Sequence, residues 1–172
     1  HAADLLEQDM LSFLELCVRE AGKTYIDAIA EVREAVDFCR YYADQCESEA
    51  YCSREALGVV ACISPWNFPL AIFIGQITAA LSAGNCVVAK PAPQTPIIAY
   101  EAVRLLHRAG VPIDALHLVH GPAREIGDRL TGHADVSGVC FTGSTGTAKR
   151  INMALAEKDG PIATLIAETG GQ

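Results

Sequence analysis

From Leu57 onward the sequence alternates between short apolar runs and longer segments of helical pattern, and this alternation constrains the fold most strongly. The apolar runs are residues 58–63, 86–89, 116–119, 136–141 and 164–167. The segments between them, residues 69–83, 96–109, 124–131 and about 146–157, are predicted to be helices. Because uniformly apolar strands are covered on both faces, the runs indicate a parallel sheet. With right-handed crossovers, the prediction is an α/β fold with a doubly wound, Rossmann-like sheet of about five strands.

The region before this sheet, from about Ala3 to Ser53, has a helical pattern throughout. It predicts two long helices, one ending at Gly22 and one running from about Thr24 to Glu47. The apolar face of the second helix is predicted to contain Ile26, Ile29, Ala30, Val32, Ala35, Val36 and Cys39. We therefore predict a helical segment over residues 1–56 and a Rossmann-like domain over residues 57–172.

Charge and hydropathy exclude several classes of function. The 172 residues include 13 Lys and Arg against 21 Asp and Glu, for a net charge of −8. Nucleic acids and anionic membrane surfaces attract basic proteins, so neither is an expected partner of this segment. No run approaches the roughly 18 apolar residues of a membrane span. The chain begins with His1 rather than Met, and we expect it to be part of a longer protein.

The seven cysteines are widely spaced and form no CxxC pair. This pattern does not favour a zinc site or a disulfide framework, and the scattered histidines add no metal-ligand spacing. We predict no metal site. Free thiols in this number favour a reducing, cytoplasmic location, where most of them would serve as small core residues.

Polar or glycine-rich segments follow each predicted strand, at residues 64–68, 90–95, 120–121, 142–145 and 168–171. Ligands of open parallel sheets bind beyond the carboxyl ends of the strands. The clustering of these segments therefore predicts a ligand site at that edge.

Four features within these segments can carry chemistry, and each has an ordinary structural alternative. The turn over residues 141–146 can bind a pyrophosphate with backbone N–H groups, or it can be a plain helix cap. Lys90 can contact a phosphate or ribose oxygen, or it can be a surface lysine. Asn67, between two prolines, can donate to an oxyanion, or it can stabilise a turn. Glu168, beside glycines, can be a movable general base, or it can be a solvated loop residue.

Taken together and in order, these motifs strongly resemble the aldehyde dehydrogenase superfamily. The resemblance spans essentially the whole chain and is carried by Pro-Trp-Asn-Phe-Pro at 65–69, Lys-Pro-Ala at 90–92, Gln-Thr-Pro at 94–96, Phe-Thr-Gly-Ser-Thr at 141–145 and Glu-Thr-Gly-Gly at 168–171. Residues 16–24, 31–42 and 165–172 are similar to the proline utilization A family. Its bifunctional members join a proline dehydrogenase to an L-glutamate γ-semialdehyde (1-pyrroline-5-carboxylate) dehydrogenase, and this segment is similar to the NAD-binding domain of the latter.

The resemblance implies a mechanism and a set of roles. A cysteine thiolate attacks the aldehyde, hydride passes to NAD⁺, and a glutamate activates water to hydrolyse the thioester. On matching positions, Asn67 would hold the oxyanion, Glu168 would be the base, Lys90 would contact the adenosine ribose, and Ser144 after Gly143 would contact the pyrophosphate. The cofactor cleft would be lined by Ile63, Ser64, Pro65 and Trp66. FAD would belong only to a separate domain of the parent protein, which would be a homo-oligomer.

The resemblance also sets limits. The catalytic cysteine of the family is expected beyond Gln172, so the segment alone is expected to be inactive. Many members have a glutamate where Pro93 stands, which leaves the choice between NAD and NADP open. Two other classes of function stay open: a non-catalytic nucleotide-binding or scaffolding module, and an interaction fragment whose leading helices dock a partner.

Overall fold

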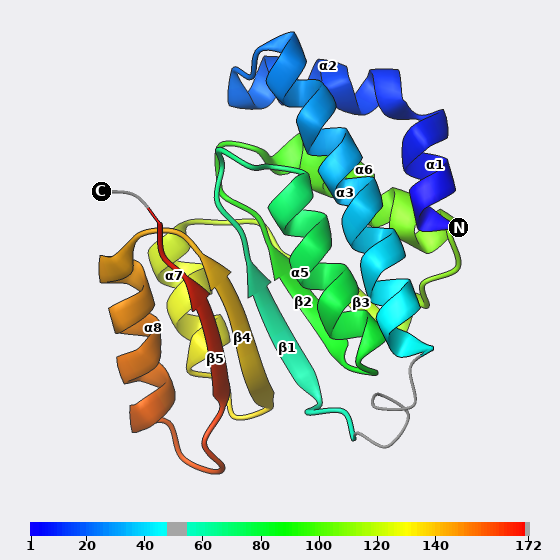
Figure 1. The fold of residues 1–172 in the computed structure, drawn as a ribbon. Coiled ribbons are helices and arrows are strands. Elements are labelled where there is room, and N and C mark those ends of the chain that lie inside the picture. The colour runs from blue at the N-terminus through cyan, green and yellow to red at the C-terminus, as the bar shows by residue number, and fades with distance from the viewer. Residues whose placement is uncertain (48–54, 171–172) are drawn as a thin grey trace.

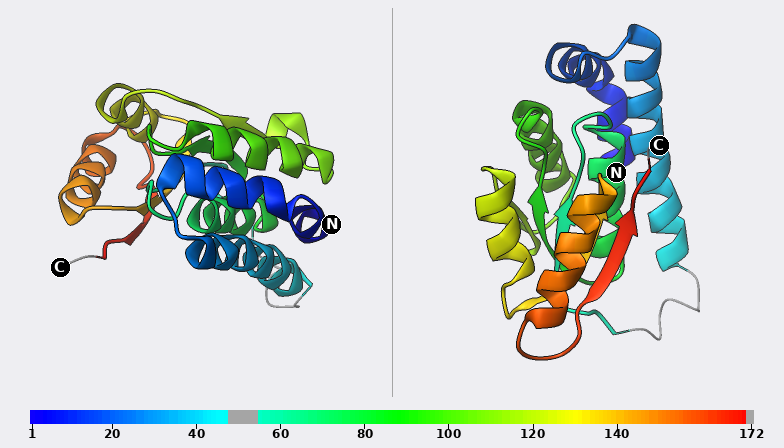
Figure 2. Two further views of the ribbon diagram at one scale, coloured as in Figure 1. Left: turned by 90° about the horizontal axis from the view of Figure 1, so that it is seen from above. Right: turned by 90° about the vertical axis from the view of Figure 1, so that its left-hand side faces the viewer.

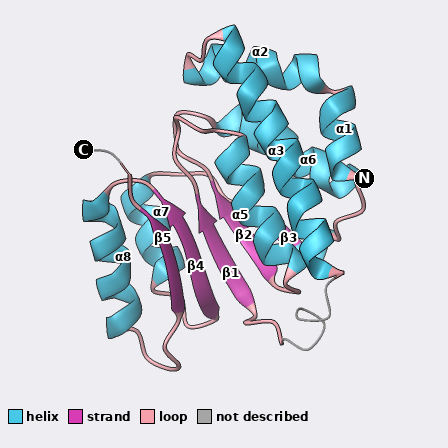
Figure 3. Cartoon of the chain, in the orientation of Figure 1, coloured by secondary structure: helices cyan, strands magenta, loops and turns pink. Residues whose placement is uncertain are grey.

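Five parallel strands form one sheet in the computed structural model, which describes residues 1–47 and 55–170. The strands are β1 (Val59–Ile63), β2 (Cys86–Lys90), β3 (Leu116–Leu118), β4 (Val136–Thr142) and β5 (Thr164–Glu168). Their order is β3-β2-β1-β4-β5, and every neighbouring pair is parallel, so the arrowheads in Figure 3 point to the same edge. The predicted doubly wound α/β sheet is confirmed.

The helices between the strands begin and end within two residues of their predicted bounds. They are α5 (Ala71–Ser82), α6 (Pro96–Arg108), α7 (Ala123–Thr131) and α8 (Thr145–Glu157), with a short 3₁₀ helix at Ile113–Ala115. Figure 1 shows α5 and α6 on one side of the sheet and α7 and α8 on the other.

The leading region differs from the prediction of two long helices, because the first is divided. Helices α1 (Ala2–Gln8) and α2 (Met10–Ala21) meet at Asp9, whose ψ of 14° leaves the helical path. The Asp9 carboxylate accepts from Arg108 of α6 at 2.8 Å, a contact that periodicity does not reveal. Helix α3 (Tyr25–Cys46) follows, and the predicted end of the helical region at Ser53 lies outside the described residues. Figure 2 shows α1 and α2 lying against α3 and α6.

Two apolar clusters cover the two faces of the sheet. Successive residues of β1 alternate between them, with Val60 and Cys62 in the larger cluster and Ala61 in the smaller. The larger cluster joins α1, α2 and α3 to α5, α6 and strands β1 to β3, whereas the smaller joins β1 and β4 to α8. The leading helices therefore share a core with the sheet, and the division at residue 56 stays a prediction.

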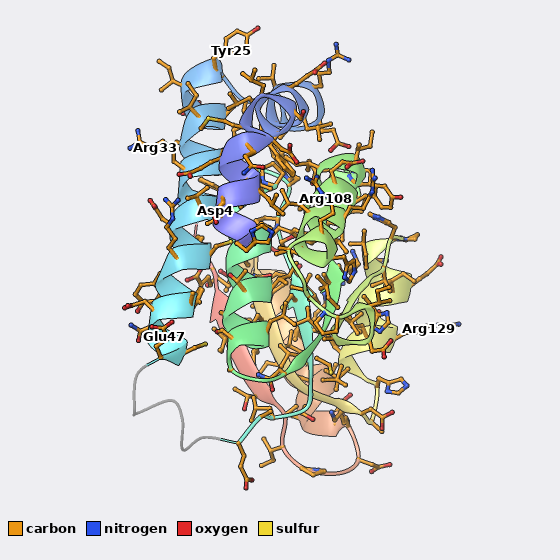
Figure 4. All side chains as sticks on the ribbon, turned by 90° about the vertical axis from the view of Figure 1, so that its right-hand side faces the viewer. Asp4, Tyr25, Arg33, Glu47, Arg108 and Arg129 are labelled. Atoms are coloured by element: carbon orange, nitrogen blue, oxygen red, sulfur yellow. The ribbon has the colours of Figure 1, made fainter. Side chains whose placement is uncertain are left out.

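Two predictions about buried surfaces are wrong. Strand β5 was expected to be covered on both faces, but it is an edge strand with Ile166 59% exposed. On α3, Ile26, Ile29 and Ala30 are exposed, while the buried side includes Ala28 and Glu31. The cause is that α3 packs against α5 with the side that contains Glu31, which leaves Ile26, Ile29 and Ala30 on the opposite side at the surface. Figure 4 shows Tyr25 and Arg33 pointing outward from this helix.

In residues 1–47 and 55–170, no helix is long and apolar enough to cross a membrane. The same residues contain no group of three or more His, Cys, Asp or Glu side chains placed to hold a metal ion. Of the cysteines, Cys17 and Cys62 are buried and Cys86 is exposed, and all six in this part of the chain are free thiols. Cys52 lies outside the described residues.

Candidate functional site

A cleft of about 730 Å³ opens at the carboxyl ends of β1, β2 and β4. Strands β1 and β4 are neighbours although two strands separate them in the sequence, so the chain reverses its winding direction at this point. Such switch points are where open α/β sheets bind ligands, and the volume is in the range of small-molecule sites. The structure therefore has a ligand-sized cleft at the predicted edge.

The cleft brings together all seven residues predicted to bind a cofactor, together with Asn67. They are Ile63, Ser64, Pro65, Trp66, Lys90, Gly143 and Ser144. Glu168 does not line the cleft, but its Oε2 lies 3.5 Å from the hydroxyl of Thr142, which does. Gly171, the last glycine of the Glu-Thr-Gly-Gly motif, lies outside the described residues.

The segment that carries Asn67 is held at both ends. At its start, the Ser64 N–H donates to the carbonyl of Lys90 at 3.3 Å. At its end, Leu70 and Ala71 begin helix α5. The Asn67 side chain is exposed to the cleft, and among the described residues it has no hydrogen-bond partner, so its amide is available to a ligand.

Lys90 is buried, 3% exposed, which excludes the surface-lysine interpretation. Burial disfavours the charged ammonium and lowers the pKa of Lys90 below its usual value. Its Nζ donates to the carbonyl of Pro91 at 3.3 Å, and it has no ion-pair partner among the described residues. A buried ammonium with donors to spare at the wall of a cleft is suited to a ligand with anionic or hydroxyl oxygens.

The glycine-rich turn ends at the N-terminus of α8. The Ser144 hydroxyl caps this helix by accepting from the Thr147 N–H at 3.3 Å. The Gly143 N–H donates to the carbonyl of Glu168 at 3.1 Å, so it is not free for a phosphate as the sequence suggested. The N–H groups of Thr145 and Gly146 lie in the first turn of α8, before the first N–H groups that bond within the helix. They form part of the positive end of the helix dipole. An anion is therefore better suited to the N–H groups at the start of α8 than to the N–H group of Gly143.

Gly143 is needed for a steric reason. A Cβ added there would lie 2.6 Å from the ring of Phe141, which is buried beside the cleft. We expect Gly143→Ala to lower the free energy of unfolding by about 1–3 kcal/mol, as overpacking does. Denaturant unfolding measures this effect.

The control for this variant is Gly146→Ala, because a Cβ at Gly146 meets nothing within 4 Å. That variant is expected to retain the stability of the wild type. Equal losses in the two alanine variants would contradict the steric explanation.

Sequence reasoning missed a series of hydrogen-bonded side chains that connects α5 to Glu168. Gln76 of α5 donates to the Thr142 hydroxyl at 3.0 Å, and that hydroxyl lies 3.5 Å from the Glu168 carboxylate. The Gln76 Oε1 is buried without a partner in the described structure. The signal in the sequence was a single glutamine on a largely apolar helix, between the buried residues Phe73 and Ile77. These hydrogen bonds link α5 to the ends of β4 and β5 and limit the positions that the Glu168 side chain can take.

Sequence reasoning also missed the far wall of the cleft. Asp128 and Thr131 of α7 and Arg150 of α8 line it, on the side of the sheet that α7 and α8 cover. No local motif marks these three residues, since only the packing of α7 against α8 brings them to the cleft.

Comparison with known proteins shows what the chain is similar to. The model of the aldehyde dehydrogenase family matches residues 1–172. The chain is 53% identical over 174 residues to the bifunctional protein PutA of Rhizobium meliloti, covering 99% of this chain and 14% of that protein. It is 38% identical to a 1-pyrroline-5-carboxylate dehydrogenase of Staphylococcus aureus, covering 91% of this chain and 34% of that protein.

The fold agrees with these relatives. The crystal structure of a mutant proline utilization A of Bradyrhizobium japonicum superposes with a TM-score of 0.94 at 57% identity. The match covers 99% of this chain and 19% of that one. The chain thus spans a small part of the length of its relatives. On the family match over its full length, the chain belongs to the aldehyde dehydrogenase family.

Proposed function

We propose that this chain is the cofactor-binding part of an NAD-dependent dehydrogenase that oxidises L-glutamate γ-semialdehyde, the open form of 1-pyrroline-5-carboxylate, to glutamate. The observation that carries the proposal is the cleft, where one edge of the sheet assembles an amide, a buried ammonium and a helix N-terminus. Similarity to a bifunctional PutA and to a 1-pyrroline-5-carboxylate dehydrogenase supports the choice of substrate.

The residues present fit NAD⁺. The spare donors of the buried Lys90 suit ribose oxygens, and the N-terminus of α8 suits a pyrophosphate. Ile63, Pro65 and Trp66 supply apolar and aromatic surface for the rings. When bound, this cofactor supplies an acceptor for the hydride from the carbonyl carbon of the substrate.

The chain's own residues would act before and after that transfer. A thiolate from outside this chain bonds to the aldehyde carbon, and the carbonyl oxygen becomes an oxyanion. The Asn67 amide N–H donates to that oxyanion and stabilises it. After the thioester has formed, the Glu168 carboxylate removes a proton from water, which attacks the acyl carbon and releases the thiol and the carboxylate product.

Further parts of the proposal concern the full-length protein. A small aldehyde is the substrate, FAD would belong to another domain, and the protein would be a homo-oligomer. The free thiols of the described residues support a reducing, cytoplasmic location.

The test is to assay the full-length protein for NADH at 340 nm with 1-pyrroline-5-carboxylate and, separately, with a simple aliphatic aldehyde. We expect a strong preference for 1-pyrroline-5-carboxylate in kcat/KM. Activity on the aliphatic aldehyde alone would overturn the proposed substrate. Absence of activity on both would favour the non-catalytic nucleotide-binding module.

Pro93 offers a test of cofactor choice. It lines the cleft and has no side-chain acceptor for a ribose hydroxyl, whereas a carboxylate there would accept from ribose and repel the 2′-phosphate of NADP. We expect Pro93→Glu to raise the NAD/NADP ratio of kcat/KM by about tenfold, the effect of roughly one hydrogen bond. Pro93→Gln, which accepts a hydrogen bond without the charge, is the control. An unchanged ratio in the glutamate variant would place the ribose away from residue 93.

A further inference from the structure

A buried carboxylate outside the cleft holds the segment that carries Asn67. Glu31 lies in the second turn of α3 and is 1% exposed. Its Oε2 accepts from the backbone N–H groups of Leu70 and Ala71 at 3.1 and 2.9 Å. These residues are 39 and 40 positions away in the sequence. They are the N-cap and the first residue of α5, directly after the segment from Ser64 to Pro69.

Helix α5 depends on this outside carboxylate, because its own sequence provides no cap. Its N-cap residue is Leu70, no side chain of its own caps it, and no acidic residue lies in its first turn. The first N–H groups of a helix need acceptors, and a negative charge is favoured at this end. Glu31 therefore determines where α5 begins relative to α3.

Lys23 connects the Glu31 carboxylate to Phe68, the residue after Asn67. Its Nζ donates to Glu31 Oε1 at 2.9 Å and lies 4.1 Å from the centre of the Phe68 ring. Gly22, at φ 65°, ends α2 in the left-handed conformation and turns the chain so that Lys23 points inward. In this ion pair the Lys23 ammonium contacts Phe68, and the Glu31 carboxylate accepts from Leu70 and Ala71. All three contacted residues follow Asn67 in the sequence.

We propose that Glu31, oriented by Lys23, is a positioning residue for the Asn67 amide in the oxyanion step. This inference rests on the proposed function of Asn67. The segment is anchored at the strand end by Ser64 and at the helix end by Glu31, with Asn67 between the two anchors. An oxyanion donor must be held in place before the reaction, so loosening one anchor lowers the rate without removing the donor.

The test is a double-mutant cycle in the full-length protein. Glu31→Gln keeps the shape of the side chain but removes its charge from Lys23 and from the start of α5. We expect it to lower kcat roughly tenfold with the KM for NAD⁺ within about twofold of wild type, the size of a small misplacement. Lys23→Met, which keeps the aliphatic stem, is expected to lower kcat in the same direction. In an Asn67→Ala background, Glu31→Gln is expected to change kcat less than about twofold, because its effect passes through the missing amide.

Asn85→Ala is the matched control for a purely structural effect. The Asn85 side chain is also buried and also accepts from two backbone N–H groups, those of Leu57 and Gly58, at 2.7 and 3.1 Å. Asn85 lies at the opposite end of the strands, away from the cleft. The Asn85→Ala variant is expected to have a lower free energy of unfolding, with kcat per folded enzyme unchanged.

The outcomes separate this inference from the proposed function. Suppose that Asn67→Ala lowers kcat, but Glu31→Gln lowers kcat equally with and without Asn67, or in neither case. The positioning role of Glu31 is then overturned and the proposed function stands. If Asn67→Ala leaves kcat unchanged, both the role of Asn67 and the inference are overturned.

Discussion

Replacing Asn67 by alanine in the full-length protein is expected to lower kcat by about 10²–10³-fold, the loss seen when one preorganised oxyanion donor is removed. In the proposed mechanism the amide contacts charge that develops only in the transition state, so the KM for the aldehyde should change little. The donor is exposed in the cleft, has no partner among the described residues and is held from both ends of its segment. Steady-state NADH formation with both substrates varied gives the two constants.

Gln94→Ala is the control for this variant. Gln94 is another exposed amide on a loop at the same edge of the sheet, and it does not line the cleft. Its removal is expected to leave kcat within about twofold of wild type, as for surface substitutions. If Asn67→Ala instead raised KM with kcat unchanged, the amide would bind the substrate in its ground state and not the oxyanion.

Replacing Glu168 by glutamine is expected to separate the two halves of the reaction. Loss of a general base should lower the steady-state rate by about 10²–10⁴-fold. In the proposed mechanism the first half of the reaction does not need this base, so a rapid burst of about one NADH per active site should remain before the slow phase. Stopped-flow absorbance at 340 nm resolves the two phases.

The position of Glu168 explains why glutamine is the informative replacement. The carboxylate is exposed at the end of β5, and Thr142, held by Gln76, lies beside it. Glutamine preserves the shape and polarity of this contact but cannot accept a proton. Glu157→Gln, at the exposed end of α8, is the control and should retain both phases. Equal loss of burst and steady state would place Glu168 in the first half of the reaction.

Much of the architecture was predictable because it is encoded locally. An apolar run bounded by turn residues predicts a strand wherever it occurs, and Gly22, Gly84 and Gly110 mark helix ends through backbone geometry alone. Since parallel strands end at one edge, the same local information also predicted that Asn67, Lys90 and Ser144 would line one cleft.

Three features were not predictable, and each depends on residues far apart in the sequence. Asp9, at the break between α1 and α2, pairs with Arg108. One wall of the cleft comes from the packing of α7 and α8, and the N–H groups at the start of α5 bind Glu31. In the sequence, Glu31 looks like an ordinary polar residue on an amphipathic helix, and Ile26 looks like a core residue.

The amino-acid sequence alone was therefore enough to predict the elements of the fold, their parallel arrangement, the edge of the sheet where the cleft opens and the family to which the chain belongs. Three features depend instead on long-range packing: which side of α3 is buried, the shielding of Lys90 from solvent, and the contact of a distant ion pair with the residues after Asn67. The physical reason is that periodicity and turn chemistry act over a few residues. Burial of a charge, by contrast, depends on which donors another element brings to it, and here those donors lie 39 and 40 residues away.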